Sequence, residues 1–255
     1  MALRQVGKMF ANATVALEDF SLEVRDGEFV SLLGPSGCGK STALRLIAGL
    51  GEPSRGEVVW AEGGARPGRR GAATIGFVFQ EPTLMPWASV FDNVYLPLRL
   101  RRWDRAKAAP LVQEALDGVG LSDFSRAYPR ELSGGMRMRV SIARALVTRP
   151  KLLLMDEPFA ALDEITRFRL NNDLVTLYRA LRKTVVFVTH SVFESVYLSS
   201  RIVVMSPQPG RVFAEVAVDV PYPRLESFRT SAEYAGYCRI ASETLARAMA
   251  DEALQ

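Results

Sequence analysis

Histidine and cysteine are scarce in this sequence of 255 residues, which contains one histidine and two cysteines, Cys38 and Cys238. Two cysteines so far apart give no disulfide framework, which predicts a reducing compartment. No apolar run is long enough to span a bilayer, and the N-terminal residues lack the apolar core of a signal peptide. We therefore expect a cytoplasmic chain that serves a membrane only through a partner.

The sequence also lacks internal repeats, low-complexity segments and any strong excess of charge. Lysine and arginine total 32, aspartate and glutamate total 28, and the net charge is +4. This mild excess suits an anionic ligand or a membrane surface, although many proteins with neither share it. Because no dense basic stripe is present, we expect no nucleic-acid partner.

Short apolar runs alternate with helical patterns along much of the chain. The runs predict buried strands at Phe29–Leu33, Ile75–Phe79, Leu152–Met155, Val185–Val188 and Ile202–Met205. Clear helical patterns occupy Ser41–Gly49 and Leu162–Leu181. Since buried strands interleaved with helices are typical of parallel sheets, the pattern predicts an α/β fold.

Three stretches depart from this alternation. The segment from about Val90 to Ala145 has helical periodicity and no clear strand, which predicts a helical insert. The stretch Gly63–Gly71 is rich in glycine and arginine, which predicts a solvated loop. After Met205 we expect a short strand-like tail and an amphipathic helix over roughly Ser231–Ala250. Its predicted apolar face consists of Cys238, Ile240, Leu245 and Met249.

A phosphate-binding loop is predicted where the first buried strand meets its helix. The segment "GPSGCGKST" fits the pattern G-x-x-x-x-G-K-[ST]. Its glycines let the backbone wrap around phosphates at the N-terminus of a helix, Lys40 would reach the β- and γ-phosphates, and the Ser41 hydroxyl would bind Mg²⁺. The predicted nucleotide-binding residues are Gly34, Pro35, Ser36, Gly37, Cys38, Gly39, Lys40, Ser41 and Thr42.

Two carboxylates follow the apolar run of "KLLLMDEP". A buried strand would place Asp156 at its carboxyl end, which is the ligand edge of an open α/β sheet. Asp156 would then hold the Mg²⁺ shell, and Glu157 would take a proton from an attacking water. Next to a phosphate loop, this pair indicates nucleotide hydrolysis rather than an acidic strand end in solvent.

A second anion-binding turn is predicted in "ELSGGMRMRVSIARAL". Ser133, Gly134 and Gly135 precede a helix that carries Arg137, Arg139 and Arg144. Taken alone, the turn fits an ordinary serine-capped helix equally well. Since one nucleotide does not need two phosphate loops, the economical interpretation is that this turn serves a nucleotide held by another copy.

With these motifs, the chain resembles the nucleotide-binding subunit of an ATP-binding-cassette (ABC) transporter. The resemblance covers nearly the whole chain, and the remaining motifs occur in the family's order. They are the glutamine loop "FVFQEP" with Gln80, the signature "LSGGM" at Leu132–Met136, "AALD" with Asp163, and "VTHS" with His190. Phe10 matches the aromatic residue that stacks on adenine, with Val15 beside it; core packing is the alternative for Phe10.

The resemblance implies a single ABC ATPase domain with a P-loop (RecA-like) core, an antiparallel β subdomain and a helical insert that carries the signature. It implies boundaries at 1–88 and 148–206 for the core with its β subdomain, 89–147 for the insert and 207–255 for the C-terminal tail. It also implies catalytic roles for Glu157, His190, Gln80 and Lys40, and Mg²⁺ binding by Ser41, Gln80 and Asp156.

The resemblance further implies ATP bound between two head-to-tail copies, or between this chain and a paralogous subunit. The partners would be membrane permease subunits and, indirectly, a solute-binding protein, so the chain would lie on the inner face of the cell membrane. The apolar segment Leu84–Trp87 would dock the permease, although packing inside the insert explains Trp87 equally well.

Some residues depart from the family pattern. Met136 and Met138 stand where glutamine is usual, and Ser191 follows His190 where aspartate is usual. The "LMPW" and "LSGGM" stretches resemble importers of nitrate, sulfonates or taurine. The alternative function is an ABC-type ATPase of DNA repair or translation, but those proteins usually carry long coiled coils or tandem cassettes.

Overall fold

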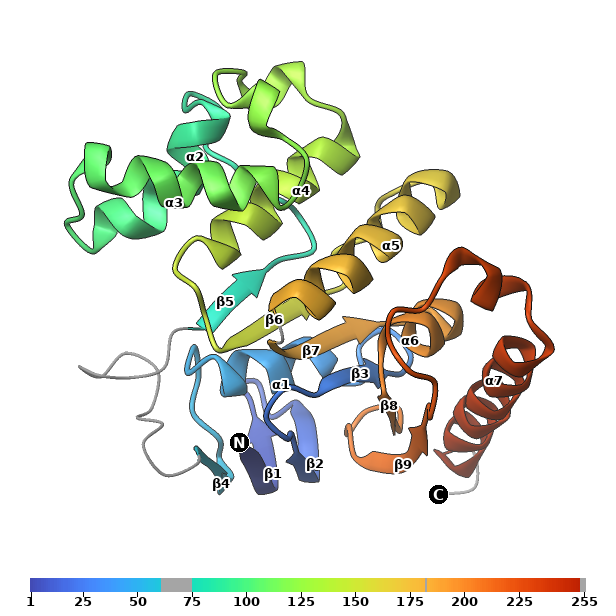
Figure 1. Cartoon of the computed structure of the whole chain (residues 1–255). Helices are drawn as coiled ribbons and strands as arrows, with labels where there is room; N and C mark the ends of the chain where they lie inside the picture. Colours follow the sequence, from blue (N-terminus) through green and yellow to red (C-terminus); the bar gives the residue numbers. More distant parts are fainter. Residues whose placement is uncertain (61–74, 182, 253–255) are drawn as a thin grey trace.

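Two sheets form the framework of the protein (Figure 1). The computed structural model describes residues 1–60, 75–181 and 183–252, so the stretch Gly63–Gly71 lies outside the described residues. The larger sheet has the strand order β5 (Ile75–Val78), β6 (Leu152–Asp156), β7 (Thr184–Thr189), β3 (Phe29–Leu33), β8 (Arg201–Met205) and β9 (Val212–Ala217). All neighbours in this sheet are parallel except β8 and β9. The predicted parallel α/β sheet is thus confirmed.

The smaller sheet is antiparallel, as the resemblance implied. It consists of β2 (Val15–Glu23), β1 (Ala2–Met9) and β4 (Arg55–Val59), in that order. Leu17 also forms an isolated bridge to Gly210, which follows β8 in the larger sheet. The start of β2 is therefore joined to the loop between β8 and β9.

Successive side chains along each central strand point to opposite faces of the larger sheet, so hydrophobic core lies on both faces. Val30 and Leu32 of β3 pack with α1 (Lys40–Ile47) and the smaller sheet. Phe29 and Leu33 face the opposite way and pack with the other helices. Both faces are covered, which is why the central strands read as continuous apolar runs.

The helical insert contains α2 (Val90–Leu100), α3 (Arg105–Asp117) and α4 (Gly134–Leu146), with 3₁₀ turns at Ser122–Phe124 and Pro129–Glu131. No strand occurs between residues 90 and 145, all of which the structure describes. Side chains cap the N-termini of the three helices, from Ser89, Asp104 and Ser133. The insert lies beyond β5 at one edge of the sheet (Figure 1).

The remaining helices are α5 (Glu164–Leu181), α6 (Val192–Leu198) and α7 (Ala232–Glu252), the last preceded by a 3₁₀ turn at Glu226–Thr230. None of the helices in the described ranges is long and apolar enough to cross a membrane.

Of the four residues predicted for the apolar face of α7, two are covered and two are exposed. Cys238 is buried and Leu245 packs against the core, but Ile240 is 45 % exposed and Met249 is 52 % exposed. At 100° per residue, Ile240 lies about 200° around the helix from Cys238, on the opposite side. The face that is covered is instead made by Tyr234, Cys238, Ala241, Leu245 and Ala248.

Candidate nucleotide-binding site

The phosphate loop lies between the end of β3 and the start of α1. Gly39 precedes α1 with φ 97°, and a Cβ there would lie 2.5 Å from the Ala16 carbonyl oxygen, so only glycine fits. The Lys40 side chain is 4 % exposed, and its ammonium donates to the carbonyl oxygens of Gly34 (2.7 Å) and Pro35 (2.8 Å). The loop is thus curled around the one cation that the sequence assigns to the phosphates.

Asp156 and Ser41 meet although they are far apart in sequence. The strand β6 ends at Asp156, and the Ser41 hydroxyl donates to its Oδ1 atom at 2.8 Å. Burial raises the pKa of Asp156, and the hydrogen bond from Ser41 opposes that shift. Two of the three predicted Mg²⁺ ligands, Ser41 and Asp156, therefore lie side by side at the carboxyl edge of the sheet, next to the phosphate loop.

Glu157 is held between Lys40 and His190. Its Oε1 atom lies 3.6 Å from Lys40 Nζ, and its Oε2 atom lies 2.9 Å from His190 Nδ1. The backbone of Glu157 is left-handed, with φ 42°, and its N–H donates to the Val188 carbonyl oxygen. The two adjacent carboxylates therefore have different surroundings: Asp156 accepts from Ser41, whereas Glu157 lies between Lys40 and His190.

A cavity of about 440 Å³ opens over the phosphate loop. Phe10, which is 45 % exposed, lines it together with Gln80 and Glu157. The core-packing alternative for Phe10 is therefore wrong. Val15 is 37 % exposed and is not among the described lining residues. Among the described residues, the cavity is lined by Phe10, Thr14, Ala16, Ser36, Gly37, Gly39, Lys40, Ser41, Thr42, Gln80, Glu157 and Gln208.

Three of the lining residues, Thr14, Ala16 and Gln208, were not predicted. Thr14 and Ala16 flank Val15 in the stretch that resembles the adenine-binding region, so a wider view of that stretch would have included them. Gln208 lies nearly 200 residues away, and its side-chain amide donates to the Val15 carbonyl oxygen at 3.1 Å. No local motif marks it, because only the tertiary fold brings it to the cavity.

The Ser133–Gly135 turn lies outside the cavity over the phosphate loop. Ser133 caps α4 by accepting from the Met136 N–H, and a Cβ on Gly135 would lie 2.7 Å from Thr166 Cγ2. The turn thus adjoins the start of α5, and none of its residues lines the cavity over the phosphate loop. In Figure 1, α4 and α1 belong to separate parts of the molecule.

Asp163 lies next to that turn, at the start of α5. It is exposed, and its carboxylate accepts from the Thr166 N–H at 2.9 Å. Hydrogen bonds at Thr166 hold the pKa of Asp163 below its usual range. This carboxylate therefore caps α5 within a single chain.

The arginines of α4 bond within the chain. Arg137 donates to the Leu132 carbonyl oxygen and Arg139 to the Asp173 carboxylate. Arg144 donates to residues of the loop after Gln80.

Comparison with known proteins identifies the ABC transporter family. The pattern of the ABC transporter family matches residues 17–160. The uncharacterized ABC transporter ATP-binding protein MJ0412 of Methanocaldococcus jannaschii is 45 % identical over 235 residues, 92 % of this chain and 86 % of that protein. The aliphatic sulfonates import ATP-binding protein SsuB of Bacillus cereus is 41 % identical over 229 residues, 88 % of each chain.

The fold is also that of solved cassettes. The dimeric post-hydrolysis state of the ATP-binding cassette MJ0796, bound to ADP and Pi, superposes with a TM-score of 0.72 at 35 % identity and covers 87 % of this chain and 100 % of its own. The predicted fold class is thereby confirmed. The chain belongs to the ABC transporter family, as an ATP-binding subunit with the ATPase cassette.

Proposed function

We propose that two copies of this chain, or this chain and a paralogous subunit, close head to tail over two ATP molecules. One observation carries the proposal: the Ser133–Gly135 turn has the chemistry of an anion site but does not reach the cavity of its own phosphate loop. A second chain would bring its own turn to that cavity. The dimeric cassette with ADP and Pi supports this arrangement by similarity.

Magnesium fits the donor groups at the proposed site. The Ser41 hydroxyl, the Asp156 carboxylate and the Gln80 amide are oxygen donors, which Mg²⁺ prefers. The described residues contain no group of three or more His, Cys, Asp or Glu side chains that would bind a metal alone. Phosphate oxygens and waters would therefore complete the shell, and the ion would neutralise charge on the transferred phosphoryl group.

The side chains around that position have distinct proposed roles. Lys40 binds the β- and γ-phosphates, and Gln80 contacts the γ-phosphate and Mg²⁺. Glu157 accepts a proton from the attacking water, while His190 donates a hydrogen bond to a phosphate oxygen or to that water. The 2.9 Å contact between Glu157 and His190 supports a shared task for these two residues. Phe10 offers an exposed ring for stacking on adenine.

Mixing two inactive variants tests the shared site. Lys40→Ala removes the phosphate-loop lysine, and Ser133→Arg fills the anion-binding turn, so each variant alone has two defective sites. A mixed dimer has one site with both halves intact. Because random pairing gives about half mixed dimers, we expect about a quarter of wild-type turnover on mixing. The measurement is ATP hydrolysis against mixing ratio.

Mixing Lys40→Ala with Glu157→Gln is the matched control, because both defects then lie on the phosphate-loop half of the site. In that mixed dimer neither site is complete, and no recovery is expected. Absence of recovery in the first mixture, with both variants folded and the Ser133→Arg chain binding ATP, would indicate a self-contained site.

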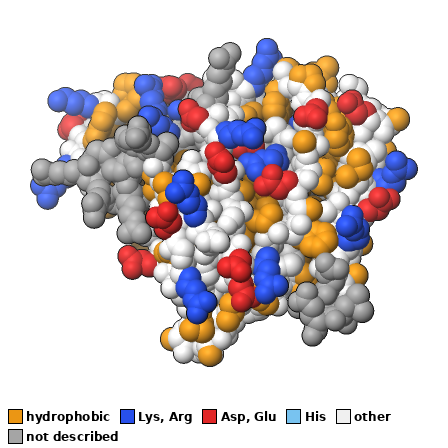
Figure 2. Space-filling model, turned by 90° about the horizontal axis from the view of Figure 1, so that it is seen from below, with side chains coloured by type: hydrophobic (Ala, Val, Ile, Leu, Met, Phe, Trp, Pro, Cys, Tyr) orange, Lys and Arg blue, Asp and Glu red, His pale blue; other side chains and the backbone are white. Residues whose placement is uncertain are grey.

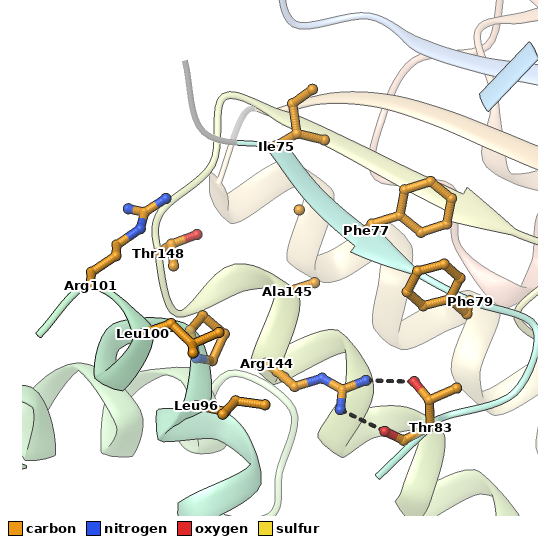
Figure 3. A pocket seen from close by; sticks show the side chains of 12 residues that line it. Ile75, Phe77, Phe79, Thr83, Leu96, Leu100, Arg101, Arg144, Ala145 and Thr148 are labelled. Carbon is orange, nitrogen blue, oxygen red and sulfur yellow. Dashed lines mark hydrogen bonds between the residues drawn. The ribbon is translucent and has the colours of Figure 1, made fainter. Parts of the chain in front are cut away.

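We propose that the permease subunit docks in the groove shown in Figure 3. This groove of about 500 Å³ lies between β5 and the helical insert and is lined by Phe77, Phe79, Leu96 and Leu100 among others. Leu100 is 76 % exposed, and Trp87, in the loop just before the insert, is 77 % exposed. The internal-packing alternative for Trp87 is therefore wrong, and an exposed apolar area of this kind is typical of a protein interface.

Trp87→Ala tests the docking surface. We expect ATP-driven transport and co-purification with membrane subunits to fall by about tenfold, the effect of losing one aromatic anchor, while hydrolysis by the isolated chain changes less than twofold. Phe124→Ala, at another exposed aromatic of the insert, is the control and should change neither. Loss of basal hydrolysis in Trp87→Ala would contradict a docking role.

Import of a small solute such as a sulfonate, nitrate or taurine is the proposed task of the assembly, at the inner face of the cell membrane. The similarity to SsuB supports sulfonates. On the face seen in Figure 2, basic and acidic side chains are interspersed, which does not favour nucleic acid. Purification from membranes, with identification of the subunits that co-purify, tests this assignment.

A further inference from the structure

The loop that follows Gln80 is clamped to the signature helix α4 by Arg144. The Arg144 guanidinium donates to the Thr83 carbonyl oxygen (2.9 Å), to the Pro82 carbonyl oxygen (2.7 Å) and to the Thr83 hydroxyl (3.1 Å). Figure 3 shows Arg144 and Thr83 joined in this way at the wall of the groove. One planar side chain thus satisfies three acceptors of a loop that lies about 60 residues earlier in sequence.

The clamped residue has an unusual backbone. Thr83 has φ 45°, in the left-handed region that β-branched residues seldom adopt. Such a conformation persists only where surrounding contacts hold it. The bonds from Arg144 to the carbonyl and hydroxyl oxygens of Thr83 supply those contacts.

A second anchor fixes the rest of the loop to the insert. Asn93 of α2 is fully buried; its amide donates to the carbonyl oxygens of Met85 and Ala88 and accepts from the Met85 N–H. Residues 82–88 are therefore anchored to α2 and α4 by hydrogen bonds. Only Phe79, Gln80 and Glu81 separate this anchored part from the end of β5 at Val78.

We propose that Arg144 is a positioning residue that couples Gln80 to the signature turn of the same chain. This inference rests on the proposed function, in which Gln80 contacts the γ-phosphate and the turn serves the nucleotide of the other copy. With the clamp intact, movement of Gln80 toward the γ-phosphate carries Pro82, Thr83 and α4 with it. The Ser133–Gly135 turn, at the N-terminus of α4, is then presented to the partner.

The clamp also adjoins the docking groove, because Thr83 and Arg144 both line it. A membrane segment seated there contacts the same bridge that links the nucleotide sensor to the signature helix. Arg144 thus joins three events through one side chain: contact of Gln80 with ATP, presentation of the signature turn, and docking of the membrane subunit.

The test is ATP-dependent dimerisation in the Glu157→Gln background, in which hydrolysis is expected to be slow. Adding Arg144→Ala should raise the dissociation constant of the ATP-bound dimer by about tenfold or more, the effect of losing hydrogen bonds from a charged group. Binding of ATP to the monomer should change less than twofold. Arg144→Lys should give an intermediate value, because a lysine reaches one acceptor rather than three.

Arg149→Ala is the matched control. Arg149 follows the same helix but pairs with Glu114 on α3 at an exposed position, so dimerisation should be unchanged. Thr83→Gly covers the case in which Arg144→Ala does not fold. It removes one of the three acceptors, the Thr83 hydroxyl, and makes the loop backbone more flexible, so it should weaken the ATP-bound dimer, by less than Arg144→Ala, without lowering the thermal midpoint.

The outcomes separate the two proposals. If Glu157→Gln alone binds ATP but does not dimerise, the shared-site proposal is overturned. If Glu157→Gln dimerises and both the Arg144→Ala and Thr83→Gly versions dimerise equally well, only the coupling role of Arg144 is overturned. Equal weakening of monomer ATP binding and of dimerisation would likewise reduce Arg144 to a structural contact.

Discussion

Glu157→Gln is expected to bind Mg-ATP normally and to hydrolyse it about 10²–10⁴-fold more slowly, the usual effect of losing a general base. Glutamine has nearly the same shape as glutamate, and its carbonyl oxygen can still accept from His190, whose Nδ1 atom lies 2.9 Å from the carboxylate. What the amide loses is the ability to take a proton. The measurements are single-turnover hydrolysis and ATP affinity.

The same variant should accumulate as an ATP-bound dimer, because closure occurs and the step that opens the dimer is blocked. Glu57→Gln is the control, since Glu57 is an exposed carboxylate paired with Arg4 on the smaller sheet. It should hydrolyse ATP at the wild-type rate. Near-normal turnover of Glu157→Gln would assign proton transfer to another group.

His190→Ala should retain ATP binding and lose about 10²-fold or more in hydrolysis, the usual effect of removing one hydrogen-bond donor from a transition state. The bonds of Lys40 to the phosphate loop and of Ser41 to Asp156 do not involve His190, so the nucleotide site stays intact. The His190 side chain is 51 % exposed and directly follows Thr189, the last residue of β7, at the carboxyl edge of the larger sheet. Its removal leaves no buried hole.

One further variant, His190→Asn, separates the two possible tasks of His190. Asparagine places an amide near the position of Nδ1, which lies 2.9 Å from Glu157, but has nothing at the position of Nε2. His190→Asn should therefore remain as slow as His190→Ala if the phosphate contact is decisive. Full recovery in His190→Asn would instead assign to His190 the task of orienting Glu157.

Because His190 is the only histidine of the chain, its ring signals in an NMR spectrum need no assignment by mutation. They should shift when a γ-phosphate analogue binds and much less with ADP. Equal shifts with both nucleotides, together with unchanged turnover of His190→Ala, would return His190 to the role of a strand-capping residue.

The sequence by itself determined the parts of this protein that depend on neighbouring residues. The phosphate loop needs a strand, a glycine at the left-handed turn and a helix N-terminus in immediate succession, and all three occur between Phe29 and Ile47. The central strands were predicted almost to the residue, because each is buried on both faces and is therefore apolar throughout. The helical insert was predicted by its periodicity in the same way.

Only the tertiary structure decided which distant groups meet. Gln208 reaches the nucleotide cavity, and Arg144 reaches Thr83, through contacts between segments that share no local pattern. The face of α7 was mispredicted at Ile240 and Met249, since the neighbours of a helix decide which apolar side chains are covered. Secondary structure and loop chemistry follow from short-range sterics and hydrogen bonds, whereas packing and long-range hydrogen bonds depend on how the whole chain folds.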